Sequence, residues 1–406
     1  MHTKPLRLVF LTPEYPPLPS GGIGVFVRAL ARLLAAQGHA VTVVGWKDGG
    51  ACSWEDAGVR VRFLSASRLP GCGWLLNRWR AQQFIRRLAV SEGVDLVEAP
   101  DWCGPSAGMH LPCPVVIRCH GSATYFGHLL HERVRIRVQL TERLALRQAA
   151  RVAAVSRFCA DTTATLFGRP KVAPASVTPH SLPPDTIRVI YNGVDTTRVQ
   201  AARETDVEPG VILSFGTLVR KKGALDLPAI FNRVVASCPQ ARLRIIGRDN
   251  PDRGTGAASI WQQMQAAFSC EARQRVEYLG PLPHEALQEQ IRGAAVCVFP
   301  SSAEAFPLTW LEAMACGKAI AGYDLPWARE AVGADAGRLA PVGDTAALAD
   351  ILLGLLANQE VCAKLGVQAR QRVEACFSQE HMLAETLRWY AEVLGNKYPA
   401  RGWRTG

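Results

Sequence analysis

No stretch of this 406-residue sequence is long and apolar enough to cross a bilayer, since no run reaches the roughly 18 apolar residues that a spanning helix needs. The apolar segment Leu6–Leu11 is cut short by Pro13, so we expect a first strand there and not a signal peptide. The twelve cysteines include no Cys-x-x-Cys pair. Their scatter through apolar segments argues against disulfides or a zinc site and predicts buried thiols of a reducing compartment.

Acidic residues are scarce in the first half of the chain. Residues 1–195 carry 23 Lys and Arg against 13 Asp and Glu, whereas the remainder carries 23 against 22, so most of the net charge of +11 lies in the first half. This asymmetry indicates an acidic partner: an anionic lipid surface, a lipid diphosphate or another phosphorylated molecule, or a polyanionic glycan. Simple solubility is the alternative. Nucleic acid is disfavoured because no DNA- or RNA-binding motif accompanies the charge.

Hydrophobic residues, in contrast, make up 48% of the chain, enough for two cores at this length. Short apolar segments alternate with amphipathic ones in the first half and again in the second, as in parallel sheets covered by helices. Residues 196–210 lose this periodicity and are typical of a linker. We therefore predict an α/β protein with two doubly wound domains, residues 1–200 and 201–377, and a terminal helical segment, residues 378–406.

The expected strands are short apolar segments. In the first half they are Leu8–Leu11, Ala40–Val44, Val59–Leu64, Leu96–Glu98, Val115–Ile117, Arg151–Val155 and Arg188–Ile190; in the second half they are Val211–Phe215, Leu243–Gly247, Val276–Leu279, Val296–Phe299 and Ala319–Ala321. A helix is expected at Val25–Gln37, ended by Gly38. The Pro-rich stretch Ala173–Pro184 is expected to be a surface loop.

Two segments of the first half combine arginine with aliphatic and aromatic residues at helical spacing. They are Leu75–Leu88, which includes Arg78, Arg80, Arg86 and Arg87, and Arg133–Arg151. Helices that lie in a membrane interface have this composition. Ordinary amphipathic helices that pack on a sheet have it too. Peripheral membrane contact is therefore one of two interpretations.

Residue types that bind ligands follow several expected strands. The glycine-rich loop Gly21–Gly24 follows the first strand and lets a ligand approach the backbone, but it is not the Gly-x-Gly-x-x-Gly of nicotinamide sites. His120 follows Val115–Ile117, at the carboxyl edge where open α/β sheets bind ligands. The basic loop Gly216–Gly223 follows the first strand of the second half, where cations can stabilise negative charge.

Two glutamates eight residues apart, Glu304 and Glu312, flank the expected start of a helix at Pro307. The free N–H groups of a helix start, together with the positive end of the helix dipole, can bind a diphosphate. Glu312 can then reach neutral hydroxyl groups beside that anion, while Glu304 precedes the turn. This arrangement suits a nucleotide-sugar. A capping residue and a solvated face would place two glutamates in the same way.

The Glu-x7-Glu spacing resembles the signature of the retaining family 4 glycosyltransferases. Other segments occur in the order of that family: Gly21-Gly22-Ile23-Gly24, His120-Gly121, Val155-Ser156, Asn192-Gly193-Val194-Asp195, Gly216 with Lys222-Gly223, and Gly247-Arg248. The resemblance covers nearly the whole chain. It implies a GT-B fold, in which two Rossmann-like domains face each other across a cleft. The first domain binds the acceptor, the second binds the nucleotide-sugar, and the C-terminal helix returns to the first domain.

The resemblance also assigns roles to single residues. It implies catalytic roles for His120, Lys222 and Glu304, and substrate-binding roles for Gly22, Arg220, Pro307, Leu308, Thr309 and Glu312. The diphosphate would lie at Lys222 and at the helix start, the ribose at Glu312, and the sugar near Glu304 and His120. The family usually has an arginine where this chain has Thr217, and we expect Arg220 or Lys221 to supply the missing charge.

The resulting expectation is a cytoplasmic, metal-independent retaining hexosyltransferase in polysaccharide or glycoconjugate biosynthesis, with peripheral membrane contact. It would have no cofactor and no metal, because no Asp-x-Asp pair is present to hold a metal diphosphate. The partners would be a nucleotide-sugar donor, a glycan, lipid-linked or phosphorylated acceptor, and an anionic membrane surface. A nucleotide-sugar epimerase, a sugar phosphorylase, or a non-catalytic glycan- or lipid-binding relative are the alternatives.

Overall fold

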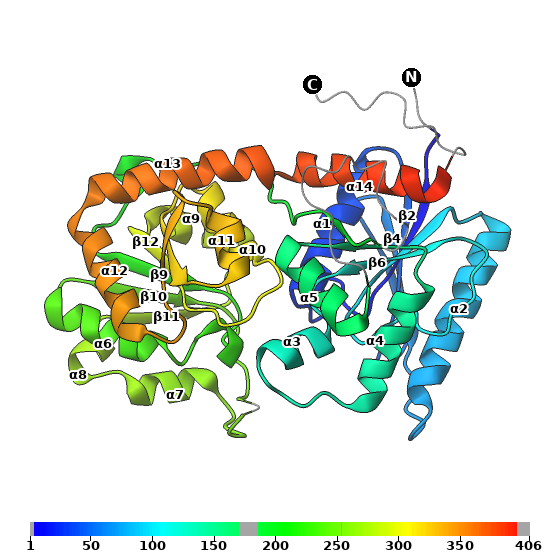
Figure 1. Ribbon diagram of the computed structural model, residues 1–406, viewed down its shortest axis with the longest axis horizontal. Coiled ribbons are helices and arrows are strands. Elements are labelled where there is room, and N and C mark those ends of the chain that lie inside the picture. The colour runs from blue at the N-terminus through cyan, green and yellow to red at the C-terminus, as the bar shows by residue number, and fades with distance from the viewer. Residues whose placement is uncertain (1–3, 170–185, 253, 396–406) are drawn as a thin grey trace. The chain divides into compact units, whose positions relative to one another are not determined.

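The chain divides into two compact α/β units. The computed structural model describes residues 4–169, 186–252 and 254–395, so the expected loop at Ala173–Pro184 lies outside the described residues. Unit 1 comprises Met1–Tyr191 and Glu380–Gly406, and unit 2 comprises Asn192–Gln379. The first segment of unit 1 therefore ends at Tyr191, before the predicted domain boundary at residue 200. In each unit a sheet is covered by helices (Figure 1).

Unit 1 is built on a largely parallel sheet. Among the described residues it has eight strands, in the order β3-β4-β2-β1-β5-β6-β7-β8, and the neighbours pair in parallel apart from β3 and β4. The strands are β1 (Arg7–Leu11), β2 (Ala40–Lys47), β3 (Cys52–Asp56), β4 (Val59–Ser65), β5 (Leu96–Pro100), β6 (Val115–Cys119), β7 (Arg151–Ala154) and β8 (Arg188–Val189). The helices are α1 (Gly22–Ala36), α2 (Gly73–Ser91), α3 (Ala123–Leu129), α4 (Ile136–Gln148), α5 (Arg157–Phe167) and α14 (Gln379–Leu394).

Helix α14 completes the core of unit 1, although it lies at the far end of the sequence. Its side chains Leu387 and Tyr390 are buried in the same apolar cluster as Phe10 of β1. A buried ion pair joins Arg118 of β6 to Glu98 of β5, with Arg118 Nε 2.7 Å from Glu98 Oε1. The Tyr390 hydroxyl donates to Glu98 Oε2 at 2.5 Å. The terminal helix is thus held to the sheet by both apolar and charged groups.

Unit 2 has a smaller sheet of the same kind. In its described part six strands follow the order β11-β10-β9-β12-β13-β14, paired in parallel. They are β9 (Val211–Phe215), β10 (Arg242–Ile246), β11 (Val276–Gly280), β12 (Val296–Phe299), β13 (Ile320–Tyr323) and β14 (Gly337–Ala340). The helices are α6 (Leu227–Ser237), α7 (Ile260–Ala267), α8 (Cys270–Arg273), α9 (His284–Gly293), α10 (Leu308–Ala315), α11 (Pro326–Val332), α12 (Thr345–Ala357) and α13 (Gln359–Cys376). The predicted fold class is confirmed.

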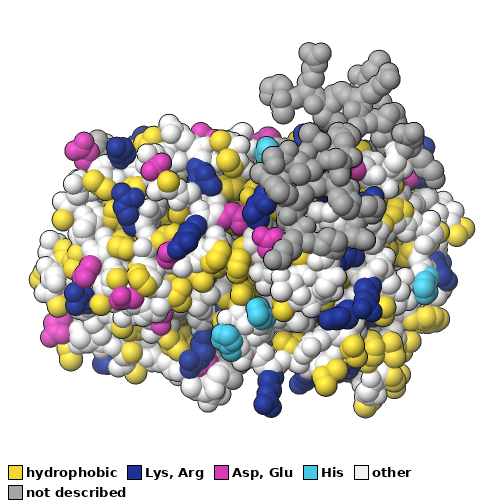
Figure 2. Space-filling view, in the orientation of Figure 1, with side chains coloured by type: hydrophobic (Ala, Val, Ile, Leu, Met, Phe, Trp, Pro, Cys, Tyr) yellow, Lys and Arg dark blue, Asp and Glu magenta, His cyan; other side chains and the backbone are white. Residues whose placement is uncertain are grey.

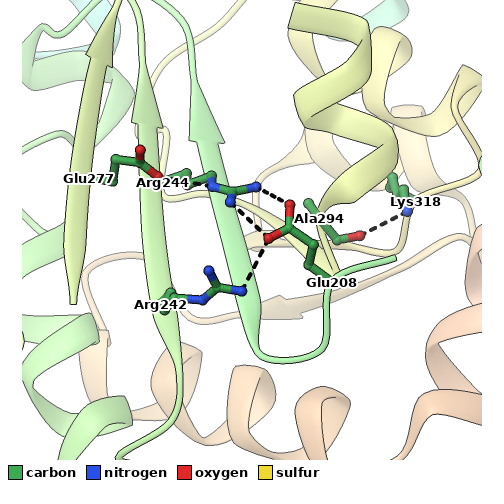
Figure 3. Close-up of polar contacts among 6 residues, drawn as sticks. All are labelled: Glu208, Arg242, Arg244, Glu277, Ala294 and Lys318. Atoms are coloured by element: carbon green, nitrogen blue, oxygen red, sulfur yellow. Dashed lines mark hydrogen bonds and ion pairs between the residues drawn. The ribbon is translucent and has the colours of Figure 1, made fainter. Parts of the chain in front are cut away.

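Charged side chains tie the linker to the amino ends of the unit 2 strands (Figure 3). Glu208, which precedes β9, accepts hydrogen bonds from Arg244 Nη2 at 2.8 Å and from Arg242 Nη2 at 3.1 Å. Arg244 also donates to Glu277 of β11 at 3.1 Å. Buried Lys318 donates to the carbonyl oxygen of Ala294 at 2.8 Å. These contacts occupy the amino edge of the sheet, so a ligand site of the open α/β kind belongs at the opposite, carboxyl edge.

In the described part of the chain, no single helix has both the length and the apolar composition needed to cross a membrane. Helices α12 and α13 meet these criteria only when taken together, and they are bent by 103° at their junction.

Candidate active site

A pocket opens at the carboxyl edge of the unit 2 sheet. Its lining includes Gly216, Thr217 and Lys222 from the loop after β9, and Ser301 and Thr309 from the segment between β12 and the first turn of α10. Adjacent strands of a parallel sheet end at the same edge, so segments that are far apart in the sequence come together there. The pocket therefore unites two of the segments that the sequence singled out.

Gly216, which lines the pocket, packs against Gly247 of the neighbouring loop. Gly216 and Gly247 follow the paired strands β9 and β10, with φ angles of +129° and +150° that side chains rarely adopt. A Cβ atom on Gly247 would lie 1.9 Å from the carbonyl oxygen of Gly216. The backbones of the two loops thus touch, and only glycine fits at Gly247.

Lys222 brings a positive charge to the pocket. It is the last residue of the short 3-10 turn Arg220–Lys222, and its Nζ lies 2.9 Å from Oε1 of buried Glu304. A Cβ atom on Gly216 would be 3.7 Å from the same Nζ, which places the ammonium group next to the Gly216 backbone. The two residues of unit 2 for which a catalytic role is predicted, Lys222 and Glu304, thus form an ion pair.

The second glutamate of the Glu-x7-Glu pattern has an unusual ionisation. Glu312 lies in α10 and is partly buried. Burial raises the pKa of its carboxyl group to about 7, and the nearby positive charge of Lys222 acts in the opposite direction. Lys222 therefore interacts with both glutamates, through an ion pair with Glu304 and through its charge with Glu312.

The start of α10 lies at the pocket, as predicted. The helix begins at Leu308, with Pro307 as its extended N-cap residue, and Thr309 lines the pocket. The first N–H groups of a helix have no acceptor within that helix and carry the positive end of its dipole. An anion in the pocket would therefore face both the Lys222 ammonium group and these N–H groups.

Arg220 is held by a carboxylate that sequence analysis missed. Its Nε and Nη2 atoms donate to the two oxygens of Asp252, each at 2.6 Å. Asp252 is buried and also accepts hydrogen bonds from the Thr255 hydroxyl and from Gln263 Nε2, and these contacts hold its pKa well below the usual range, with Arg220 as the largest cause. Arg220 is not among the described residues that line the pocket.

His120 of unit 1 follows β6, as expected. Its backbone N–H donates to Asp101 Oδ1 at 2.9 Å, and its ring contacts Phe26 edge-on with centroids 4.6 Å apart. Burial, and secondarily the charge of Arg118, lower the pKa of His120 to about 3. The imidazole is therefore neutral at physiological pH and can act as a hydrogen-bonding group, not as a cation.

Asp101 was missed by sequence analysis, although it follows the expected strand at Leu96–Glu98. It is buried, and burial raises the pKa of its carboxyl group to about 7, against the hydrogen bond from the backbone of His120. Its Oδ2 atom has no hydrogen-bond partner within residues 4–169, 186–252 and 254–395. A carboxylate directly after a strand was the signal that could have identified it.

Gly22 opens helix α1, but the start of that helix already has a negative group. Glu14 Oε2 accepts hydrogen bonds from the backbone N–H of Gly21 at 2.8 Å and of Gly24 at 3.3 Å. A Cβ atom on Gly22 would meet no described atom within 4 Å. The helix start therefore has its own carboxylate cap, which competes with the substrate contact expected at Gly22.

Among the residues that the structure describes, no group of three or more His, Cys, Asp or Glu side chains is placed to hold a metal ion. All twelve cysteines lie in this part of the chain and are free thiols, with Cys119, Cys159, Cys297 and Cys316 buried.

Known families match both units of the chain. Residues 20–198 match the family described as Glycosyltransferase Family 4, and residues 195–372 match Glycosyl transferases group 1. A glycogen synthase of Mycobacterium tuberculosis is 26% identical, with 97% of each chain covered. An alpha-maltose-1-phosphate synthase of Mycolicibacterium smegmatis is 27% identical over 96% of this chain and 100% of its own length.

Solved structures share the fold. Sucrose-phosphate synthase from Thermosynechococcus elongatus has a TM-score of 0.75 at 21% identity, covering 96% of this chain and 99% of its own. Anabaena HepE in complex with UDP and glucose has a TM-score of 0.70 at 19% identity, covering 95% and 100%.

Proposed function

The chain belongs to the family 4 glycosyltransferases, and we propose that it transfers a hexose from a nucleoside-diphosphate sugar to a hydroxyl group with retention of the anomeric configuration and without a metal ion. The donor binds to unit 2. The acceptor, a glycan or a lipid-linked or phosphorylated molecule, binds to unit 1. A cytoplasmic enzyme of polysaccharide or glycoconjugate biosynthesis fits these substrates.

The observation that carries this proposal is the Lys222–Glu304 ion pair beside the pocket, with 2.9 Å between Nζ and Oε1. When the glycosidic bond of the donor breaks, negative charge develops on the leaving diphosphate. A fixed ammonium group stabilises that charge more in the transition state than in the ground state. Lys222, together with the first N–H groups of α10, supplies this stabilisation from the protein itself.

The remaining groups of unit 2 suit the other parts of a nucleotide-sugar. Glu312, when ionised, accepts hydrogen bonds from the ribose hydroxyls, and Thr309 lies beside the diphosphate. Glu304 holds Lys222 and accepts from the sugar, so its removal is expected to lower turnover more than donor binding. Support for this class of donor comes from HepE, which has been solved with UDP and with UDP-glucose.

In the proposed reaction the acceptor oxygen forms a bond to the anomeric carbon on the face from which the diphosphate departs. The bond between that carbon and the diphosphate oxygen breaks, and the acceptor proton passes to the diphosphate. No protein nucleophile is required. We propose that His120 contributes from unit 1 as a neutral hydrogen-bonding group, in keeping with its lowered pKa.

A donor screen tests the proposal directly. UDP-, GDP- and ADP-sugars are compared by thermal shift, where a donor at 100 times its dissociation constant stabilises the protein by about 2.7 kcal/mol. The matching donor is then incubated with acceptor in EDTA, and the anomeric configuration of the product is determined by NMR. We expect a retained configuration and undiminished activity in EDTA.

Four outcomes would contradict the proposal. An inverted product would remove the retaining mechanism, and activity lost in EDTA and restored by Mg²⁺ or Mn²⁺ would remove the metal-free one. Conversion of donor alone, without any acceptor, would identify an epimerase or another GT-B reaction. Donor binding with no turnover on any acceptor would indicate a non-catalytic relative.

A further inference from the structure

Helix α4 of unit 1 turns apolar side chains outward. Ile136, Leu140 and Leu144 are 74%, 60% and 43% exposed, and their spacing of four residues places them along one face. Glu142, in contrast, is fully buried. Its carboxylate accepts hydrogen bonds from the backbone N–H groups of residues 103, 123 and 124. The inner side of α4 also holds apolar Ala145 and Leu146, so the helix exposes an apolar stripe in addition to the apolar side chains that it buries.

The exposed charged residues of α4 and of the three residues before it are all basic. Five exposed arginines accompany it: Arg133, Arg135, Arg137, Arg143 and Arg147. From residue 133 to residue 148 the only acidic residue in the sequence is Glu142, whose carboxylate faces inward. The exposed surface therefore combines aliphatic side chains with guanidinium groups and has no carboxylate of its own helix to neutralise them.

Helix α2 begins beside α4 and also exposes apolar side chains. Leu75 and Trp79 lie one turn apart, and each is more than half exposed. The guanidinium group of Arg137 lies 5.4 Å from the ring centroid of Trp74, which places the start of α2 beside α4. Figure 2 shows hydrophobic and basic side chains side by side where Figure 1 places these helices. We name Leu75, Trp79, Ile136, Leu140, Leu144 and the five arginines the basic apolar face.

One arginine that the sequence singled out does not belong to this face. Arg78 is buried and donates to the carbonyl oxygens of Trp74, Cys103 and Gly104. It stabilises the loop after β5, so the expectation that Arg78 contacts a membrane is corrected. Arg86 is exposed, but its Nε donates to the carbonyl oxygen of His110.

We infer that the basic apolar face docks on an anionic lipid bilayer. Aliphatic and tryptophan side chains are stabilised when they enter the boundary between headgroups and acyl chains, while arginine keeps its apolar stem there and its charge among the lipid phosphates. Both residue types are thus accounted for by one partner. The inference rests on the proposed function, because a lipid-linked acceptor would be presented at such a surface.

Other occupants explain only part of the face. A second copy of the chain in a symmetric dimer would bring arginines against arginines, at a cost in repulsion. A nucleic acid or a soluble polyanion would pair with the arginines but would leave the aliphatic stripe in water.

Vesicle co-sedimentation tests the inference with the full chain. Phosphatidylglycerol-containing vesicles are compared with pure phosphatidylcholine at low and at physiological salt. We expect binding to the anionic vesicles that weakens with salt, because exposed charges are screened over about 8 Å at physiological ionic strength. Each arginine near an anionic surface contributes roughly fivefold in affinity, so Arg143→Gln with Arg147→Gln should weaken binding roughly 25-fold.

The apolar stripe has its own variant and a matched control. Ile136→Ser, Leu140→Ser and Leu144→Ser together should weaken binding at least tenfold. The control is Val342→Ser with Val367→Ser in unit 2, two residues of similar exposure, which should bind like the original protein. Quenching of tryptophan fluorescence by brominated lipids should be reduced in Trp79→Phe, which reports insertion at this face.

Several results would overturn the inference. These are no binding to anionic vesicles at low salt, unchanged binding of the triple serine variant, or self-association at micromolar concentration that the serine variant abolishes. Heparin binding that persists while vesicle binding is lacking would indicate a soluble polyanion only. Thermal shift with the donor is measured on the same samples, so a failure of donor binding is distinguished from a failure of membrane binding.

Discussion

Lys222 is the residue on which most of the site's electrostatics depend, because it faces one glutamate directly and a second through space. We predict that Lys222→Ala lowers turnover by at least ~100-fold, the scale of losing one fixed charge stabiliser. Steady-state kinetics with saturating donor measure the effect. Lys221→Ala is the matched control and should be mild. Comparable, small losses in both variants would show that this loop does not act in catalysis.

The raised pKa of Glu312 makes donor binding depend on pH. If the ionised carboxylate accepts the ribose hydroxyls, donor affinity should rise about tenfold between pH 6 and pH 8 as a group with a pKa of about 7 loses its proton. Calorimetry should use the intact nucleotide-sugar, whose diphosphate is esterified at both ends and lacks the ionisation of a phosphate monoester near pH 6. Glu312→Gln should bind more weakly at pH 8 and show no such rise.

The same pKa predicts an effect on stability. The ordinary value is 4.5 and the folded value is about 7, so between these pH values the native state keeps a proton that the unfolded chain has released. The free energy of unfolding should therefore fall as pH rises through this window, and Glu312→Gln should flatten that part of the profile. Asp101 contributes a slope of the same sign, so the comparison with the variant is the informative one.

Arg220 has two explanations that a pair of variants separates. If it only anchors its loop to Asp252, then Arg220→Ala and Asp252→Asn should lower thermal stability and donor binding to a similar extent. If it supplies the charge that the family places at Thr217, Arg220→Ala should lower turnover far more than Asp252→Asn does, and Thr217→Arg should restore activity to Arg220→Ala. Thermal shift and kinetics on the same samples decide between the two.

Among the elements, β5, β6 and α14 are joined by the buried contacts of Arg118, Glu98 and Tyr390. We predict that Arg118→Met destabilises unit 1 by about 3–5 kcal/mol, because Glu98 would remain buried without its partner. Chemical denaturation measures this, with hydrogen exchange of β5 and β6 to assign the transition. The exposed pair Arg60–Glu92, 2.6 Å apart, provides the control: Arg60→Ala should cost no more than about 1 kcal/mol. Equal costs would contradict the prediction.

Strands were the elements that the sequence predicted best, because a parallel strand buried on both faces reads as an uninterrupted apolar segment. The expected segments Val211–Phe215 and Val296–Phe299 coincide with β9 and β12. Strand β3, Cys52–Asp56, was missed because it lies at the sheet edge with Ser53 and Glu55 between its inward residues. Edge strands lose the continuous apolar signal.

The sequence named candidate site residues but not their contacts. Lys222 and Glu304 were separate candidates, and only the folded chain shows that they form an ion pair. Asp252 and Glu14 were missed because their roles depend on partners that the turns of the chain supply, Arg220 and the start of α1. A lone carboxylate in a polar loop carries no signal of that kind in the sequence.

At the scale of the whole molecule, the excess positive charge of the first half has more than one role. Part of it is internal: Arg28 and Arg32 both pair with Asp56, and Arg188 pairs with Glu385 and Glu392 of α14. The arginines beside the α4 stripe are part of the exposed remainder, and our membrane inference uses them. The net charge of the first half could indicate an acidic partner, but it could not show which surface of the protein binds that partner.

Unit 2 is contiguous in sequence, and we predict that residues 192–379 fold and bind the donor when produced alone. All pocket residues named here lie within this segment, and a domain with its own core can fold independently. Thermal shift with the nucleotide-sugar checks this. Residues 1–191 produced alone should not fold cooperatively, because they lack Leu387 and Tyr390. A cooperative transition in that fragment would contradict the prediction.

Because unit 1 is formed from two separate segments of the sequence, it can be completed only late in translation. After residue 191 has been made, about 200 further residues must be translated before α14 is complete, which takes about 10–40 s at 5–20 residues per second. Throughout that interval Arg118 and Glu98 have each other but not Tyr390, and the apolar surface that α14 covers stays open. The first unit therefore stays incomplete and accessible to chaperones, whereas the second unit can already have folded. The yield of folded enzyme in cells should therefore depend on how well chaperones protect residues 1–191 during this interval.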